Sequence, residues 1–118
     1  MIAKTLLLLV MMLGMLSIPS AEGQTTDRTK VTTTTVVCGA ASAPVLAAND
    51  NRNFLLFIND HATQVIYLQV DAVATLNAGI RVNAVGGSHQ FNSKVPIGAF
   101  TCIATGATTN LLVVEGTK

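Results

Sequence analysis

Residues 45–60, VLAANDNRNFLLFIND, constrain the fold of this chain more than any other stretch. A short apolar segment leads into the polar residues 49–53, and a dense apolar run follows that ends at Asn59 and Asp60. Asn and Asp tolerate a left-handed backbone and cap their own turns, so a turn here needs no glycine. The second apolar run, residues 53–58, is short and mostly apolar, as expected for a strand that is covered on both faces. The stretch therefore predicts two strands and a polar turn in an all-β domain.

Similar short runs recur along the rest of the chain, at spacings of about ten residues. We expect strands at residues 31–38, 45–48, 54–58, 65–70, 79–82, 88–91, 100–104 and 111–115. Residues 71–78 form a loop or a single helical turn, Pro44 disfavours pairing at its own position, and Gly86-Gly87 permits a turn with positive φ. About seven to eight short antiparallel strands predict one small β-sandwich or jelly-roll-like barrel at residues 31–118.

The N-terminal residues do not resemble part of this domain. Lys4 precedes the apolar run LLLLVMML at residues 6–13, and Pro19 and Ser20 come before the small residues Ala21 and Gly23. This order is typical of a secretory signal peptide at residues 1–23, cleaved between Gly23 and Gln24 or after Ala21. The charge-free residues 5–18 are short for a membrane span, which needs about 20 residues, so membrane contact is expected only in transit. The alternative is an uncleaved apolar arm packed against other subunits or a membrane. A polar linker follows at residues 24–30.

Charge is sparse in this chain. Only 11% of the residues are charged, the net charge is +1, and the cations are scattered, so no basic stripe is available to neutralise phosphates. We therefore expect no nucleic-acid partner. A surface with so few charges suits a subunit that is partly buried in an assembly.

Cys38 and Cys102 each fall within an expected strand, one near the start of the domain and one near its end. In an exported chain the even count favours a disulfide between them. The alternative is a pair of buried thiols that behave as small apolar groups. No CxxC motif or nearby histidine pair is present, so the spacing excludes a zinc site.

Catalytic chemistry is not apparent. His61 and His89 lie in or beside turns, and the sequence contains no GxSxG, P-loop or HExxH motif. Four carboxylates occupy separate turns and strand ends, where turn formation explains them better than catalysis; they are Asp50, Asp60, Asp71 and Glu115. With no Trp and one Tyr, the chain also lacks the exposed rings on which sugars stack. Its four phenylalanines, Phe54, Phe57, Phe91 and Phe100, are expected in the core. We predict a chain that is not an enzyme and needs no cofactor or metal.

Residues 41–116 resemble a group of small proteins encoded among the virion genes of tailed bacteriophages and prophages. The resemblance rests on several segments in order: ASAPVLAANDNR, the apolar strand that ends at Asn59-Asp60, VIYLQV, GIRV, the Gly86-Gly87-Ser88 turn with Phe91, VPIGAF and LLVVEG. It implies a β-sandwich that serves as a capsid decoration, neck or tail-associated subunit, with no catalytic residues. Such a subunit would dock in many copies on capsid or tail proteins of the particle, and would also form a homo-oligomer. Residues 24–30 and the loops at residues 59–63 and 105–110 are the segments expected to make these contacts.

The N-terminal segment and the two cysteines depart from that group. Both features fit an exported protein, so the alternative function is a periplasmic or cell-surface β-sandwich domain that binds a glycan or a protein. The expected location is therefore the virion, or alternatively the periplasm or the medium.

Overall fold

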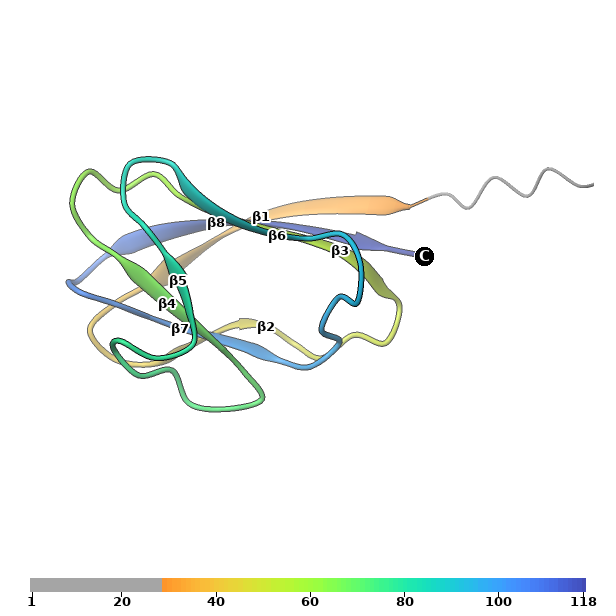
Figure 1. Cartoon of the computed structure of the whole chain (residues 1–118), viewed down its shortest axis with the longest axis horizontal. Coiled ribbons are helices and arrows are strands. Elements are labelled where there is room, and N and C mark those ends of the chain that lie inside the picture. The colour runs from red at the N-terminus through yellow and green to blue at the C-terminus, as the bar shows by residue number, and fades with distance from the viewer. Residues whose placement is uncertain (1–28) are drawn as a thin grey trace, which may run out of the picture.

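The computed structural model describes residues 29–118, and within them the chain forms eight strands and no helix (Figure 1). The strands are β1 (Lys30–Cys38), β2 (Ala43–Leu46), β3 (Arg52–Asn59), β4 (Ile66–Val70), β5 (Ile80–Val82), β6 (Gly87–Phe91), β7 (Phe100–Ala104) and β8 (Thr109–Thr117). The all-β prediction is confirmed. The predicted signal peptide, its cleavage point between Gly23 and Gln24, and residues 24–28 of the expected linker lie outside the described residues.

The strands form two antiparallel sheets of four. Sheet A has the order β1-β8-β3-β6, and sheet B has the order β2-β7-β4-β5. Apart from β4 and β5, every pair of neighbouring strands comes from distant parts of the chain, which gives the jelly-roll form of the β-sandwich. Figure 1 shows the two sheets as the upper and lower layers of the molecule.

The core lies between the sheets and follows the alternation of each strand. On β3 and β8 the residues that face sheet B are buried, including Leu55, Phe57, Leu111 and Val113. Sheet B contributes Ile66 and Leu68 of β4 and Phe100 and Cys102 of β7. The rings of Phe57 and Phe100 meet across the core with their centroids 5.1 Å apart.

A disulfide joins the two sheets. Cys38 at the end of β1 is bonded to Cys102 in β7, and the two Cα atoms lie 5.8 Å apart. Both cysteines are fully buried, and the backbone N–H of Ala104 donates to the carbonyl of Gly39 beside the bridge at 2.8 Å. The predicted disulfide is therefore confirmed.

Three strands, β2, β3 and β8, differ from the sequence prediction by two residues at one end or both. The strand expected at residues 45–48 lies at Ala43–Leu46 and includes Pro44, which is tolerated because β2 is an edge strand. Strand β3 already begins at Arg52, and β8 begins at Thr109 rather than at Leu111. In both strands, pairing with a neighbouring strand extends the strand into polar residues that the sequence prediction had left in the preceding turn or loop. Residues 71–78 are a loop, as one of the two alternatives proposed.

A polar side chain closes the turn before β3 as expected, whereas the turn before β6 differs from its prediction. Asn49 Oδ1 accepts a hydrogen bond from the backbone N–H of Asn51 at 3.1 Å, which closes the turn before β3. In the turn before β6 the positive φ values fall on Val85 (61°) and Gly86 (77°), one residue earlier than the expected Gly86-Gly87 pair. A β-branched residue rarely adopts such a conformation. It is held here because the N–H of Val85 donates to the carbonyl of His61 and that of Gly86 donates to the carbonyl of Asn59.

Candidate functional site

Local structural contacts account for both histidines. His61 lies in the β3–β4 loop, where its Nδ1 accepts hydrogen bonds from the backbone N–H groups of Thr63 at 3.1 Å and Gln64 at 3.0 Å. His89 lies on β6, and its ring meets the ring of Phe91 edge to face at 4.7 Å between centroids. The structure does not bring the two rings into one site, since they belong to different elements with separate contacts.

The four carboxylates are also separated. Asp71 Oδ1 accepts a hydrogen bond from the backbone N–H of Ala99 at 2.9 Å, and Glu115 is paired with Arg52. Asp50 and Asp60 are exposed in turns. Within residues 29–118 no three His, Cys, Asp or Glu residues gather in a way that could hold a metal ion.

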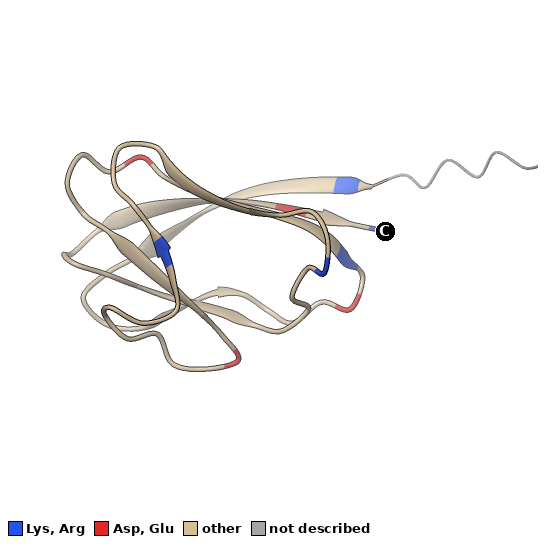
Figure 2. Ribbon diagram, in the orientation of Figure 1, with Lys and Arg blue, Asp and Glu red and all other residues tan. Residues whose placement is uncertain are grey.

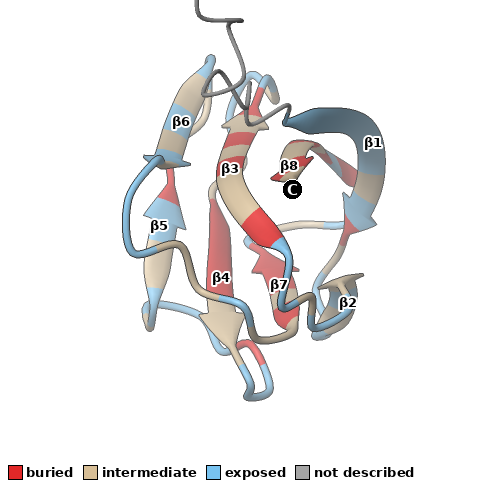
Figure 3. Ribbon diagram, turned by 90° about the vertical axis from the view of Figure 1, so that its right-hand side faces the viewer, coloured by how far each residue is buried: buried red, intermediate tan, exposed pale blue. Residues whose placement is uncertain are grey.

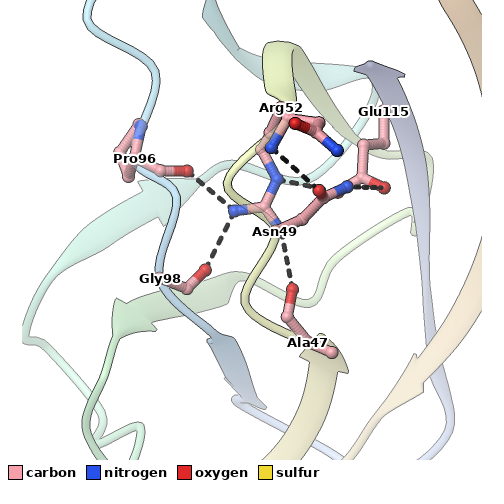
Figure 4. A network of polar contacts seen from close by, with 7 residues as sticks. Ala47, Asn49, Arg52, Pro96, Gly98 and Glu115 are labelled. Atoms are coloured by element: carbon pink, nitrogen blue, oxygen red, sulfur yellow. Dashed lines mark hydrogen bonds and ion pairs between the residues drawn. The ribbon is translucent and has the colours of Figure 1, made fainter. Parts of the chain in front are cut away.

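The strongest polar network is centred on Arg52, at the start of β3 (Figure 4). Its Nε donates to Glu115 Oε2 of β8 at 2.7 Å. One terminal nitrogen donates to the carbonyls of Pro96 at 2.7 Å and Gly98 at 2.9 Å, and the other donates to the carbonyl of Ala47 at 2.8 Å. The guanidinium also lies 5.6 Å from the ring centroid of Phe100. All the guanidinium nitrogens therefore have partners within the domain.

Arg52 has a structural function that the sequence pattern did not predict, because residue 52 was expected only to belong to a polar turn. The guanidinium is almost completely buried, and it holds the β2–β3 turn and the β6–β7 loop against sheet A. One signal was available in the sequence. Glu115 is the single charged residue in the apolar run LLVVEG, and a carboxylate in a buried strand requires a partner.

Two shallow hollows lie beside each other at one end of sheet A. The larger, of about 330 Å³, is lined by Asp60, His61, Ala62, Thr108 and Asn110. The second, of about 250 Å³, shares Asp60 and Asn110 and continues over Thr35, Ile58 and Leu112. The structure thus brings together the two loop segments, residues 59–63 and 105–110, that were expected to make contacts. Asn59 itself is buried at the end of β3, where its Nδ2 donates to the carbonyls of Gln64 and Val82, and it does not line either hollow.

The second hollow opens onto the side of sheet A that faces away from sheet B, which we call the outer face of sheet A. The strand register places on it Val31, Thr33, Thr35 and Val37 of β1, Asn110, Leu112 and Val114 of β8, Phe54, Leu56 and Ile58 of β3, and Ser88 and Gln90 of β6. None of these side chains is charged, and most are apolar. Figure 2 shows how few charged residues the domain carries, several of them at the end where the C-terminus lies.

No described element covers this outer face. The described strands all belong to the two sheets, and no helix is present among them. The apolar residues of β3 and β8 on this face are only partly buried, while Val31 and Val37 of β1 are 60% and 55% exposed. Figure 3 shows the exposed stretch of β1 at the edge of the sheet.

Sheet B differs from sheet A in this respect, because the β4–β5 loop covers part of its outer face. Tyr67 of β4 and Ile103 of β7 pair across that face and form a small buried cluster with Ala74 of the β4–β5 loop. The hydroxyl of Tyr67 donates to Asn77 Oδ1 of the same loop at 2.9 Å. The only tyrosine of the chain is therefore covered by protein and offers no platform for a sugar.

These observations correct two sequence predictions. The apolar strand β3 was expected to be covered on both faces, but only its inner residues, such as Leu55 and Phe57, are buried. Phe54 was expected in the core with the other phenylalanines, but it lies on the outer face of sheet A and is partly exposed. The apolar character of β3 reflects a core on one side and an open apolar surface on the other.

No protein-family model, curated protein or solved structure matches this chain. A search of the described residues for a helix able to cross a membrane finds none.

Proposed function

We propose that this chain is a non-enzymatic structural protein of a virion, a capsid decoration, neck or tail-associated subunit that docks in many copies on capsid or tail proteins. The observation that carries the proposal is the outer face of sheet A, which is uncharged, carries mostly apolar residues and is covered by no other described element. Large exposed apolar surfaces are unusual on monomeric proteins and mark interaction sites. On sheet B, by contrast, the β4–β5 loop covers Tyr67 and Ile103, although Val73 and Leu76 of that loop are themselves exposed.

The composition of this surface suits a protein partner. The centres of protein interfaces are depleted in charge and rich in apolar side chains, as are β3 and β8 on this face. At its end the two hollows add the side chains of Asp60 and Asn110 as hydrogen-bonding groups beside Ile58 and Leu112. The sequence resemblance to virion proteins supplies the class of partner. The jelly-roll fold is compatible with it, since viral capsid domains use this fold, as do lectins and cupins.

Incorporation into particles tests the proposal. The source culture is induced to produce virions, the particles are banded on a density gradient, and the chain is quantified in the band by mass spectrometry. We expect many copies per particle for the wild-type chain. Replacing Leu112, which lies on the outer face between Thr35 of β1 and Ile58 of β3, by lysine is expected to reduce incorporation at least tenfold, because the charge would have to be desolvated in the interface.

The matched control is Val73→Lys, which adds the same charge at an apolar side chain that is 73% exposed on the β4–β5 loop of sheet B. This variant should be incorporated like the wild type, and both variants should have unchanged circular dichroism. Absence of the wild-type chain from purified particles would refute the virion assignment. Equal incorporation of both variants would refute docking through the outer face of sheet A.

The disulfide favours a second candidate, an exported periplasmic or cell-surface domain that binds a glycan or a protein. Stable disulfides are typical of oxidising compartments and rare in the cytoplasm. The intact mass of the chain from its source separates the candidates when combined with particle association. A chain that begins at Gln24 or Glu22, keeps the bridge and is free of particles supports this candidate. A bridged chain found on particles supports a subunit that attaches from outside the host cell.

A further inference from the structure

We infer that two copies of this chain pair through their β1 strands, antiparallel and about a two-fold axis at Thr34, so that the two A sheets become one continuous sheet. The inference deepens the proposed function, on which it rests, by naming a second copy as one of the partners. It concerns the edge of sheet A, whereas docking on the particle uses the outer face.

Strand β1 offers an open edge for pairing. It is the terminal strand of sheet A and pairs along its whole length with β8 on one side only. A terminal strand presents a row of backbone N–H and C=O groups that can accept another strand. Natural proteins commonly protect such edges with a proline, a bulge or inward-pointing charges. In β1 the register with β8 is regular, the sequence is KVTTTTVVC, and the only charged residue is Lys30 at its first position.

Exposure along β1 also fits an edge that is used. Residues 30–35 are exposed on both faces of the strand. This stretch includes a run of four threonines, and threonine has high β propensity. Within the described part of the chain, the run has a neighbouring strand on one side only.

The charge of Lys30 favours the antiparallel orientation of the two β1 strands. Parallel pairing of two β1 strands would place the two Lys30 side chains next to each other. Antiparallel pairing centred on Thr34 separates them by eight residues, which is about 27 Å at the rise of a strand. This distance exceeds the screening length of about 10 Å at ordinary ionic strength. Antiparallel pairing therefore avoids the like-charge contact that the parallel orientation would create.

The two exposed valines of β1 indicate which residues of the two copies lie opposite each other. With Thr34 on the two-fold axis, Val31 of one copy lies opposite Val37 of the other, and this pair occurs twice. Val31 and Val37 are the two most exposed apolar side chains of β1, and both lie on the outer face. Directly opposed β-branched residues stabilise an antiparallel pair, and Thr33 opposite Thr35 fills the space between the two valine pairs.

Cysteine cross-linking of the full chain tests the axis. In the proposed register the Cα atoms of the two Thr34 residues lie about 4.5–5.5 Å apart, which is within the range that a disulfide spans. Thr34→Cys is therefore expected to form a covalent dimer under mild oxidation. Thr32→Cys is the matched control, because it lies on the same face with the same exposure, but the two copies of this position are separated by four residues along the strands. We expect at least tenfold less dimer from the control.

A charge-pair experiment tests the register without relying on oxidation. Val31→Lys and Val37→Glu are each expected to weaken dimerisation in sedimentation velocity, since each places a charge opposite a valine. The double variant is expected to restore it, because each introduced lysine then faces the introduced glutamate of the other copy.

Several outcomes would overturn the inference: a wild-type chain that stays monomeric at every concentration, equal cross-linking of Thr34→Cys and Thr32→Cys, or no recovery in the double variant. These results are independent of the particle assay. Cross-linking at Thr34 with no loss of incorporation for Leu112→Lys would retain the dimer and refute docking through the outer face. Reduced incorporation of Leu112→Lys with no cross-linking at Thr34 would retain docking through the outer face and refute the dimer.

Discussion

At the scale of single residues, Arg52 shows how one charged side chain can organise an otherwise apolar domain. Its guanidinium replaces solvation by water with Glu115 and three backbone carbonyls. Those carbonyls belong to segments without regular structure, at Ala47, Pro96 and Gly98. The network therefore ties the β2–β3 turn and the β6–β7 loop to sheet A.

Arg52→Met is expected to lower the free energy of unfolding by about 3 kcal/mol, because it leaves the Glu115 carboxylate and three carbonyls without their donor. Arg52→Lys should recover only part of this loss, since a lysine has no planar fork to reach all four acceptors. Urea denaturation measures both. Arg81→Met is the control, because Arg81 is exposed and bonds only the nearby Asn83 side chain, and its midpoint should shift little. Equal midpoints for Arg52→Met and Arg81→Met would contradict a structural role for the network.

At the scale of strands and loops, some features can be predicted from the local sequence pattern, whereas others depend on how the strands pair and pack. The central residues of each strand, such as FLLFI in β3 and FTCIA in β7, are predictable from β-branched and apolar character. Strand ends are not, because Arg52 and Thr109 adopt extended structure only where a neighbouring strand pairs with them. The local sequence also does not encode whether a face of a sheet is covered by another part of the chain. Strand alternation places Phe54 and Phe57 on opposite faces of one apolar run, but only the arrangement of the sheets shows that the face of Phe57 is the covered one.

Substitutions in the β4–β5 loop can test whether this loop covers the outer face of sheet B. Ala74 is 2% exposed against sheet B, whereas its neighbour Val73 is 73% exposed. Ala74→Glu is expected to destabilise the domain by roughly 3 kcal/mol, because it would bury a charge or expel the loop from Tyr67 and Ile103. Val73→Glu should leave stability within about 0.5 kcal/mol, as is usual for an exposed position. Thermal and urea unfolding, together with Tyr67 fluorescence as a reporter of the covered face, measure both variants. A similar stability for the two would show that the loop does not cover sheet B in solution.

At the scale of the whole molecule, the jelly roll places the first and last strands of the domain side by side in sheet A and β2 beside β7 in sheet B. Nearly all strand pairs therefore join distant parts of the chain. Such topologies fold slowly, because long loops must close before the contacts that stabilise them can form. The disulfide joins residues separated by 64 positions and links the two sheets covalently. The sequence could suggest this pairing from cysteine parity and strand position, but only the topology brings the end of β1 to β7.

Removal of the bridge is expected to have a large effect on stability. In the chain-entropy model, a cross-link over a loop of this length stabilises the fold by about 4 kcal/mol. Cys38→Ala/Cys102→Ala should therefore unfold at a much lower urea concentration than the wild type, with a similar or larger dependence on denaturant because the unfolded chain is more expanded. Reductant provides the control, since it should shift the wild type to a comparable midpoint and leave the double variant unchanged. A wild-type midpoint that does not respond to reductant, despite complete reduction shown by mass, would mean that strand pairing and the Arg52 network hold the sheets together without the bridge.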